Sequence, residues 1–417
     1  MTSEGKPLDI VIAGAGLGGL AAAIGLRRVG HRVTVLERSA SVGTVGAGIQ
    51  FAPNAARLLI AWGVVDRVGD NAVAAEAGVR RRWEDGRVLG TAPMGAPIRE
   101  RFGAGYLCAH RADFHGALVA TAVDPDDPGT PVIIELGAGV TDVVPDDGGR
   151  ALVRYGDGAK RGADVVVGAD GIRSAVRDAL FGPQPTSFSG QVTNRMVIDV
   201  TGLPDVEMLQ QLAATPVQNI WIGPGRHAIT HPMRGTAQFY LGVTIDRGLS
   251  RDEAFWSEAL TVDAVLDELA GWDPNLRTLV GLAPEVTAYG LHDSEPLASW
   301  GRGRATLLGD ACHAMLPFQA QGAAQAIEDA AVLASTLAGV DAAGAPDALR
   351  RYEALRMPRT ARVQLASRAN GGTFHMSDGP EQRERDAALR RGSGDFASYD
   401  WLWAVGPDAA PTALITV

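Results

Sequence analysis

The sequence predicts an α/β fold with a Rossmann-type unit at its start, an inserted β-sheet layer in the middle and a helical C-terminal region. The opening residues alternate between a short apolar strand, Leu8 to Ala13, a helix, Gly19 to Val29, and a second strand, Arg32 to Glu37. The stretch His227 to Val243 alternates apolar and polar residues around Arg234 and Gly235, which indicates a hairpin. Alanine-rich and then charged helical segments follow Gln321, the second spanning Ala345 to Ser367 with a kink expected at Pro358. Mixed elements of this order are typical of α/β domains with an inserted sheet.

Composition limits the classes of protein to be considered. The chain has 417 residues, 46% of them hydrophobic, enough for two or three domains with a large core. Its net charge of −10 argues against nucleic acid as a partner, because that partner requires a basic face. The two cysteines, Cys108 and Cys312, have no metal-ligand spacing, and we expect both to be reduced and buried. With no leader-like N-terminus and no apolar run suited to a membrane span, we expect a cytoplasmic protein.

A glycine-rich turn follows the first predicted strand. Gly14, Gly16 and Gly19 form a GxGxxG pattern between strand and helix, and Glu37 closes the next strand. In this pattern the first glycine makes the tight turn, the second lets the backbone approach a pyrophosphate, and the third lets helix and strand pack closely. The acidic residue then binds a ribose hydroxyl. The sequence therefore predicts a dinucleotide site at this turn.

Two later strands end in glycine with an aspartate close behind. Asp164 to Gly168 is followed by Asp170, and Ala305 to Gly309 is followed by Asp310. Ligands bind beyond the carboxyl ends of strands in open α/β sheets, so Asp310 is placed to accept hydrogen bonds from a polyol chain. The alternative is that Asp310 only caps the segment after it. No second GxGxxG is present, which argues against a separate Rossmann domain for another nucleotide.

Together, the GxGxxG turn, DVVVGADGIRSAVR (Asp164 to Arg177) and GRATLLGDACHAMLPFQAQGAAQAIEDAAVL (Gly303 to Leu333) resemble the three fingerprints of the class A flavoprotein monooxygenases. This is the family of p-hydroxybenzoate hydroxylase and salicylate hydroxylase. Further segments extend the resemblance over almost the whole chain and favour the salicylate and 3-hydroxybenzoate hydroxylase branch: GAGIQFAPNAARLL (Gly46 to Leu59), HRADFHGAL (His110 to Leu118), HPMRG (His231 to Gly235) and YEALRMPRTARVQLASRANG (Tyr352 to Gly371).

The resemblance implies FAD as cofactor, NADH or NADPH and O₂ as co-substrates, and a small aromatic substrate hydroxylated through a flavin C4a-hydroperoxide. It implies no metal, and either a monomer or a homodimer. Pro317 would lie beside the reactive flavin carbon, and Phe318 departs from the histidine that salicylate hydroxylases often have there. The cofactor-binding residues implied are Gly14, Gly16, Gly19, Glu37, Arg38, Ala47, Gly48, Arg111, Asp170, Asp310, Gly322 and Ala323.

Four parts are expected on this basis. Residues 1–182 form the first part of the FAD-binding domain, with a β-rich excursion near 76–105, and 281–340 form its second part. Residues 183–280 form the substrate-binding β-sheet domain, and 341–417 a helical C-terminal region. We expect Glu328 and Asp329 to be structural and His313 to order the loop beside Asp310. An epoxidase or dehydrogenase of the same fold, or a non-catalytic flavin-binding protein, stays an alternative.

The candidate catalytic side chains are His227 and His231, together with Pro317. The two histidines are four residues apart on a predicted strand, so both side chains share one face. His227 matches a histidine of the family, whereas His231 stands where tyrosine is usual. A phenol is more electron-rich as a phenolate, and histidine is suited to take its proton near neutral pH. Alternatively, both are ordinary strand residues.

Overall fold

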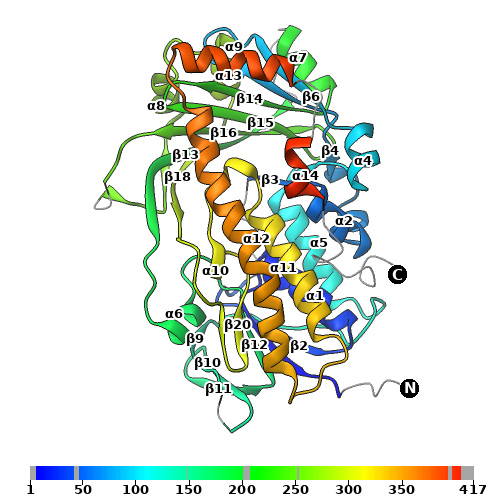
Figure 1. Cartoon of the computed structure of the whole chain (residues 1–417). Helices are drawn as coiled ribbons and strands as arrows, with labels where there is room; N and C mark the ends of the chain where they lie inside the picture. Colours follow the sequence, from blue (N-terminus) through cyan, green and yellow to red (C-terminus); the bar gives the residue numbers. More distant parts are fainter. Residues whose placement is uncertain are drawn as a thin grey trace.

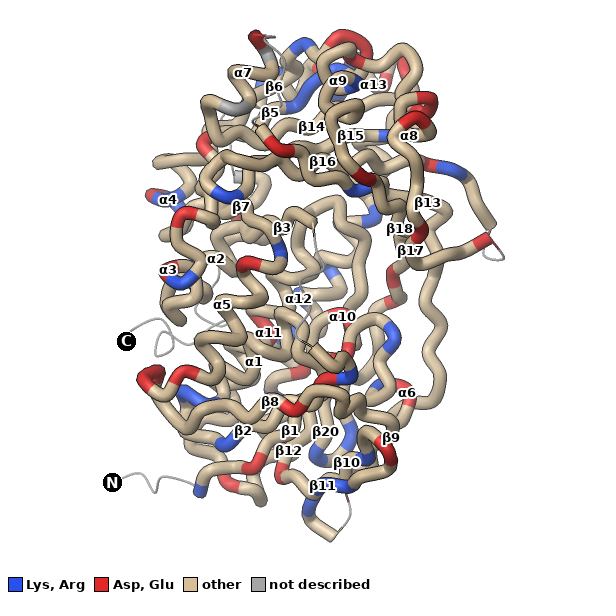
Figure 2. Tube along the Cα trace, turned by 180° about the vertical axis from the view of Figure 1, so that it is seen from behind, with Lys and Arg blue, Asp and Glu red and all other residues tan. Residues whose placement is uncertain are grey.

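The computed structural model describes residues 6–41, 47–146, 148–200, 207–250, 253–392 and 397–404. Gly46, where one of the family-like segments begins, and the end of the expected C-terminal region, 405–417, lie outside these ranges. No helix among the described residues is long and apolar enough to cross a membrane. Figure 2 shows acidic and basic residues interspersed along the chain at both ends of the molecule.

A six-stranded sheet forms the lower half of the molecule (Figure 1). Its strands are parallel except at the edge pair β19–β20, and β1 is flanked by β12 and β2, which confirms the predicted strand–helix–strand unit. The strand order is β19 (Gly301–Arg302), β20 (Ala305–Leu307), β12 (Val165–Gly168), β1 (Asp9–Ala13), β2 (Arg32–Leu36) and β8 (Ile133–Glu135). The two strands expected to end near aspartates, β12 and β20, are neighbours, so Asp170 and Asp310 follow adjacent strands at the same edge.

Helices α1 (Leu17–Arg28), α5 (Arg111–Val123) and α11 (Gly322–Leu337) pack on and beside this sheet. Small residues allow α1 and α11 to approach closely: a Cβ on Gly25 would lie 3.1 Å from the Cβ of Ala334, and one on Gly18 would lie 2.9 Å from that of Ala326. The alanine-rich composition of α11 therefore has a packing reason, because larger side chains would separate the two helices.

An eight-stranded sheet forms the upper half, and it draws strands from two separate parts of the chain, 77–93 and 187–293 (Figure 1). The predicted hairpin is present as β15 and β16, with left-handed backbone at Arg234, Gly235 and Thr236 in its turn. The order is β17 (Ser257–Leu260), β18 (Val286–Asp293), β13 (Ser187–Asp199), β16 (Gln238–Asp246), β15 (Arg226–Met233), β14 (Val217–Gly223), β5 (Ala77–Arg82) and β6 (Val88–Pro93).

This sheet extends beyond the range expected from the sequence. Strand β18 lies past residue 280 and pairs along β13, and β5, from the predicted excursion, pairs in parallel with β14. The alternation of apolar and polar residues predicts that a segment is a strand, but it does not predict which distant strand that segment pairs with. Smaller sheets complete the molecule: β3 (Gly48–Phe51), β7 (Leu107–His110) and β4 (Val73–Ala74), and β11 (Ala159–Ala163), β10 (Ala151–Tyr155) and β9 (Val140–Val144).

Helix α12 (Ala345–Phe374) joins the two halves, running beside α11 from the lower sheet to the upper one (Figure 1). It continues through Pro358 and ends seven residues after the predicted Ser367, where Phe374 reaches the apolar cluster under the upper sheet. Helices α13 (Pro380–Arg391) and α14 (Asp400–Trp403) then cover the upper sheet and the cleft beside it. Other helices cover the edges: α2 (Pro53–Ala61), α3 (Val64–Val68), α4 (Ala96–Phe102), α6 (Ala175–Phe181), α7 (Glu207–Ala214), α8 (Val262–Glu268) and α9 (Pro274–Gly281).

Candidate active site

The glycine turn between β1 and α1 has the geometry expected of a pyrophosphate cradle. Gly14 has φ +100°, and a Cβ on Gly19 would lie 2.1 Å from the carbonyl oxygen of Gly14, so neither position accepts a side chain. A Cβ on Gly16 would meet nothing within 4 Å. Gly16 is also the residue that precedes α1, so the open space lies at a helix N-terminus, where backbone N–H groups favour an anion. The residues present therefore fit the diphosphate of FAD.

Glu37 lies beside this cradle at the end of β2. Its carboxylate accepts hydrogen bonds from the backbone N–H groups of Ala15 (2.8 Å) and Ser39 (2.8 Å). Burial raises its pKa, but these N–H groups outweigh burial, so the net pKa of Glu37 is lowered and the carboxylate is charged. The structure thus places an ionised acceptor next to the turn. Arg38 follows it with an exposed side chain.

Asp310 begins the short helix α10 (Asp310–His313) directly after β20. Its side chain is surrounded by protein but accessible from the cavity described below. Burial raises the pKa of Asp310, and the nearby His313 and Arg111 oppose this effect. A Cβ on Gly322 would lie 3.8 Å from Oδ1 of Asp310, so Asp310 faces the first residue of α11. A polar acceptor and a helix N-terminus therefore border the same space.

Arg111, Ala47 and Gly48 form the opposite side of this space. The backbone N–H of Arg111 donates to the carbonyl oxygen of Ala47 (2.9 Å), and Gly48 pairs with His110 where β3 meets β7. Gly48 leaves no room for a side chain, because its Cβ would lie 2.4 Å from Cε1 of His231. The strand backbone therefore passes directly beneath this histidine.

Asp170 and its neighbours are arranged differently from the other predicted cofactor residues. Asp170 accepts hydrogen bonds from the Ser174 hydroxyl (2.5 Å) and from the backbone N–H of Val176 (3.2 Å), so its carboxylate orders the start of α6. The Arg177 side chain is buried and donates to the carbonyl oxygen of Ala311 (3.2 Å). The guanidinium of Arg177 therefore points into the protein, where a carbonyl oxygen already accepts from it, and not toward the glycine turn.

A cavity of about 840 Å³ lies between the two large sheets. That volume is within the range typical of small-molecule and cofactor sites. It brings together eight predicted site residues from six elements or loops: Gly48, Arg111, His227, His231, Asp310, Pro317, Gly322 and Ala323. The remaining predicted residues lie outside its lining, around the glycine turn and the adjacent strand ends: Gly14, Gly16, Gly19, Glu37, Arg38, Ala47 and Asp170.

His227 and His231 both line the cavity from β15, so the prediction that they share one face is confirmed. The ring of His231 is buried, and its Nδ1 lies 3.3 Å from the carbonyl oxygen of Pro232. That oxygen accepts, so Nδ1 carries the proton and Nε2 offers a lone pair. Burial lowers the pKa of His231 to about 4, and this side chain is therefore neutral at pH 7.

His227 has a histidine partner. Its Nδ1 lies 2.8 Å from Nε2 of His375, a residue that directly follows α12, and its ring packs against Phe318 and Phe374. Burial, His375 and Arg80 together lower the pKa of His227 well below its ordinary value. Both rings of the pair are therefore neutral near pH 7, since burial also lowers the pKa of His375.

Several cavity residues were not found by sequence reasoning. Arg80 and Arg195 line the cavity, and the side chain of neither makes a hydrogen bond or ion pair with any described residue. The Arg80 side chain lies over the ring of Phe374, and that of Arg195 over the ring of Tyr289. Arg80 lies in a run of three arginines on β5. In the sequence such a run looks the same as the exposed face of a strand, so it did not indicate a cavity residue. A polar group formed by Gln50, Tyr106 and Gln218 also lines the cavity.

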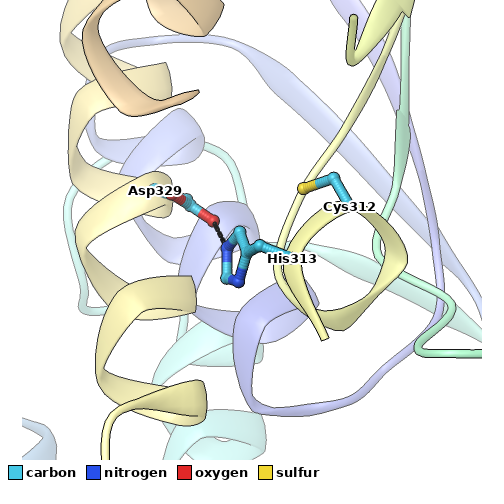
Figure 3. A group of neighbouring side chains, drawn as sticks. All are labelled: Cys312, His313 and Asp329. Atoms are coloured by element: carbon cyan, nitrogen blue, oxygen red, sulfur yellow. Dashed lines mark hydrogen bonds and ion pairs between the residues drawn. The ribbon is translucent and has the colours of Figure 1, made fainter. Parts of the chain in front are cut away.

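A cluster of possible metal ligands lies behind the cavity wall. Cys312, His313 and Asp329 have ligand atoms within 4.8 Å of one another (Figure 3). Asp329 already accepts from His313 Nε2 (2.6 Å), Arg356 Nε (2.7 Å) and the backbone N–H of Gly309 (3.1 Å), and burial raises the pKa of the Cys312 thiol. A protonated thiol and a carboxylate with three donors are poor cation ligands. The cluster instead holds the Gly309 loop that presents Asp310.

Comparisons with known proteins agree with this geometry. Residues 7–367 match the FAD binding domain family. The chain is 38% identical over 411 residues to a 3-amino-4-hydroxybenzoate 2-monooxygenase of Streptomyces platensis, covering 98% of each chain, and 35% identical over 364 residues to 6-hydroxynicotinate 3-monooxygenase of Pseudomonas fluorescens, covering 87% and 90%. A salicylate hydroxylase solved as a substrate complex superimposes with a TM-score of 0.79 at 26% identity over 98% of both chains. The expected cofactor and fold are thereby confirmed, and the chain belongs to the FAD binding domain family, among its aromatic-hydroxylating class A flavoprotein monooxygenases.

Proposed function

We propose that this protein uses NADH or NADPH and O₂ to hydroxylate a small aromatic acid of the hydroxybenzoate class, in the cytoplasm. One observation carries this proposal: a single cavity is bordered by Asp310 and the start of α11 on one side, and by two neutral histidines and two unpaired arginines on the other. The edge of a flavin can therefore bind on the first side, and an anionic aromatic ring can bind next to it on the second. The free, buried cysteines support a reducing compartment.

FAD fits the lower part of the site. We assign its diphosphate to the turn at Gly14, Gly16 and Gly19, a ribose to Glu37, and its ring end to the space between Gly48, Pro317 and Gly322. When bound, FAD accepts hydride from the nicotinamide and activates O₂ so that one oxygen atom reaches the substrate ring. The N-terminus of α11 supports negative charge on the adjoining ring edge. On this proposal residues 1–182 and 281–340 form the FAD-binding domain, and the eight-stranded sheet carries the substrate.

The charge of the cavity supports an anionic substrate. Although the chain carries a net charge of −10, the charged residues that line the cavity are four arginines and one aspartate: Arg80, Arg111, Arg195, Arg385 and Asp310. Arg80 and Arg195 have no acidic partner among the described residues, and Arg80 also lies near His227, so we assign Arg80 to hold a carboxylate in paired hydrogen bonds. The named activity of the Streptomyces platensis relative, on 3-amino-4-hydroxybenzoate, is consistent with such a substrate.

The histidines have different assignments. His231, with a pKa of about 4, stays neutral and offers Nε2 as a hydrogen-bond acceptor, so we assign it to positioning the substrate. His227 is assigned to accept the proton of a phenolic hydroxyl, because its Nδ1 already has a partner to which a proton can pass. Phe318 and Phe374 pack beside it and exclude water from this part of the cavity.

The test is a panel of hydroxybenzoates and aminohydroxybenzoates, each paired with its neutral amide. We measure substrate-stimulated oxidation of NADH and NADPH and the mass of the product. The acids should be hydroxylated, and the amides should bind about 10–100-fold more weakly, because they lose a charge-assisted contact. Arg80→Met should remove this difference between acid and amide. Stimulated NAD(P)H oxidation that yields only hydrogen peroxide across the whole panel would contradict the proposed hydroxylation.

A further inference from the structure

We propose that His227, His375 and Asp246 form a proton path from the cavity to solvent, which removes the proton that a phenolic substrate releases on binding. The inference rests on the proposed function, because it requires a hydroxylated aromatic ring in the cavity. It assigns roles to His375 and Asp246, which the comparisons and the sequence leave without one.

The inner end of the path opens to the cavity. His227 is a lining residue, and its Nε2 has no hydrogen-bond partner among the described residues, whereas its Nδ1 lies 2.8 Å from Nε2 of His375. The two ring centroids are 5.0 Å apart with an interplanar angle of 40°. One nitrogen of His227 is therefore free to meet a substrate while the other contacts the next ring.

The outer end reaches the surface. Nδ1 of His375 is buried, makes no hydrogen bond with a described residue, and lies 3.9 Å from Oδ2 of Asp246. That separation is longer than a direct hydrogen bond, so a small rotation of either side chain is needed to bring the two atoms into contact. The Asp246 side chain is 49% exposed, so a proton that arrives there is in contact with solvent.

A tight turn fixes the relative positions of the outer residues. The backbone N–H of Gly225 donates to the carbonyl oxygen of His375 (2.9 Å), and the backbone N–H of Asp246 donates to the carbonyl oxygen of Gly225 (2.8 Å). The same turn joins β14 to β15, the strand that carries His227. Backbone hydrogen bonds at this one turn therefore hold His227, His375 and Asp246 in fixed positions relative to one another, although the three residues lie far apart in sequence.

The charged groups around the path favour passing a proton along the two histidine rings over holding a proton on either ring. Arg80 faces His227 from β5, and Arg226 and Asp246 face His375 from β15 and β16. Burial and the two arginines disfavour a positive charge on either ring, so each ring keeps one N–H and one lone pair. A neutral imidazole of this kind accepts a proton at one nitrogen as it releases another at the opposite nitrogen.

The transfer balances without any oxidant or reductant. The substrate O–H bond breaks as an N–H bond forms at His227 Nε2, and the His227 Nδ1 proton passes to His375 Nε2. The His375 Nδ1 proton passes to the Asp246 carboxylate and from there to solvent, leaving a phenolate in the cavity. Both rings finish with exchanged tautomers, and a proton moving inward to the product phenolate restores them.

The test is performed on the FAD-loaded enzyme with 3-amino-4-hydroxybenzoate as probe. Rapid mixing in weak buffer with a pH-indicator dye follows proton release, and the absorbance of the bound probe follows phenolate formation. In His375→Gln, the amide keeps a hydrogen bond to His227 but cannot relay a proton. Its rate of proton release should fall by about 10²-fold or more, within the range of general-base effects. The final fraction of phenolate and the Kd of the probe should stay unchanged, because a path alters rates and not equilibria.

Asp246→Asn tests the outer end and should also slow proton release without changing probe binding. His292→Gln is the matched control: this histidine stacks on Trp256, away from the cavity lining, and its replacement should leave the rate at the wild-type value. Wild-type proton release in His375→Gln would overturn the path while leaving the proposed function intact. Failure of every panel acid to be hydroxylated by the wild-type enzyme would overturn both.

Discussion

Arg356 is the centre of a buried ion network, and we predict that Arg356→Met destabilises the protein strongly. Its guanidinium donates to Glu328 (2.7 Å), to Asp329 (2.7 Å) and to the side-chain oxygen of Gln325 (2.7 Å), and the charged groups are at most 1% exposed. Methionine keeps the apolar bulk but leaves Asp329 with only His313 as a side-chain donor. Removing one partner from a buried ion network lowers the free energy of unfolding by about 3–5 kcal/mol.

The pKa of Glu328 reflects the same network. Burial raises this pKa, but Arg356 and Arg359 outweigh it and lower the value from 4.5 to about 2. This lowering of the pKa corresponds to about 3 kcal/mol in favour of the charged carboxylate. Because the folded-state pKa is depressed, this stabilisation is complete above pH 4.5 and is lost as the pH falls toward 2.

Thermal unfolding at pH 7 is the assay. An unfolding entropy of about 2.1 cal/mol/K per residue gives about 0.9 kcal/mol/K for a chain of this length, so 3–5 kcal/mol lowers Tm by about 3–6 °C. Arg350→Met on the same helix is the control, because Arg350 is about half exposed and lies 3.8 Å from an exposed aspartate. It should change Tm by less than about 1 °C. Equal Tm values for both variants, or a stability difference that persists at pH 2, would refute the reasoning.

Three further outcomes follow from the site. Asp310→Ala should raise the Kd for FAD about 10–100-fold, since a charged acceptor is worth about 1.5–3 kcal/mol; an unchanged Kd in fluorescence titration would assign Asp310 to helix capping. Gly16→Val should fold with a native circular dichroism spectrum yet fail to retain FAD, because its side chain enters the open cradle, whereas Gly19→Ala should fail to fold. Gly48→Ala should cost about 1–3 kcal/mol of stability and weaken binding of the aromatic substrate, because its Cβ displaces His231. A substrate Kd equal to that of the wild type would show that His231 does not position the substrate.

The sequence by itself determined the parts of this protein whose chemistry depends on local backbone conformation. The turn at Gly14, Gly16 and Gly19, the strand ends before Asp170 and Asp310, and the hairpin at Arg234 are each encoded within a few neighbouring residues. Glycine at a positive φ or under a close carbonyl has no substitute, so the pattern and the structure coincide. The family resemblance rests on these segments, and the comparisons confirm it.

Only the tertiary structure decided which side chains share the cavity. His227 meets His375 across 148 residues of sequence, Arg80 arrives from a strand that pairs with β14, and β18 joins the sheet from beyond the expected boundary. Glu328 and Asp329, adjacent on one helix, both bind Arg356 because α12 lies against α11. Burial then lowers the pKa of His231 to about 4, which changes an apparent base into a hydrogen-bond acceptor. Such properties depend on desolvation and on the distances between remote segments, and no local sequence pattern specifies either of them.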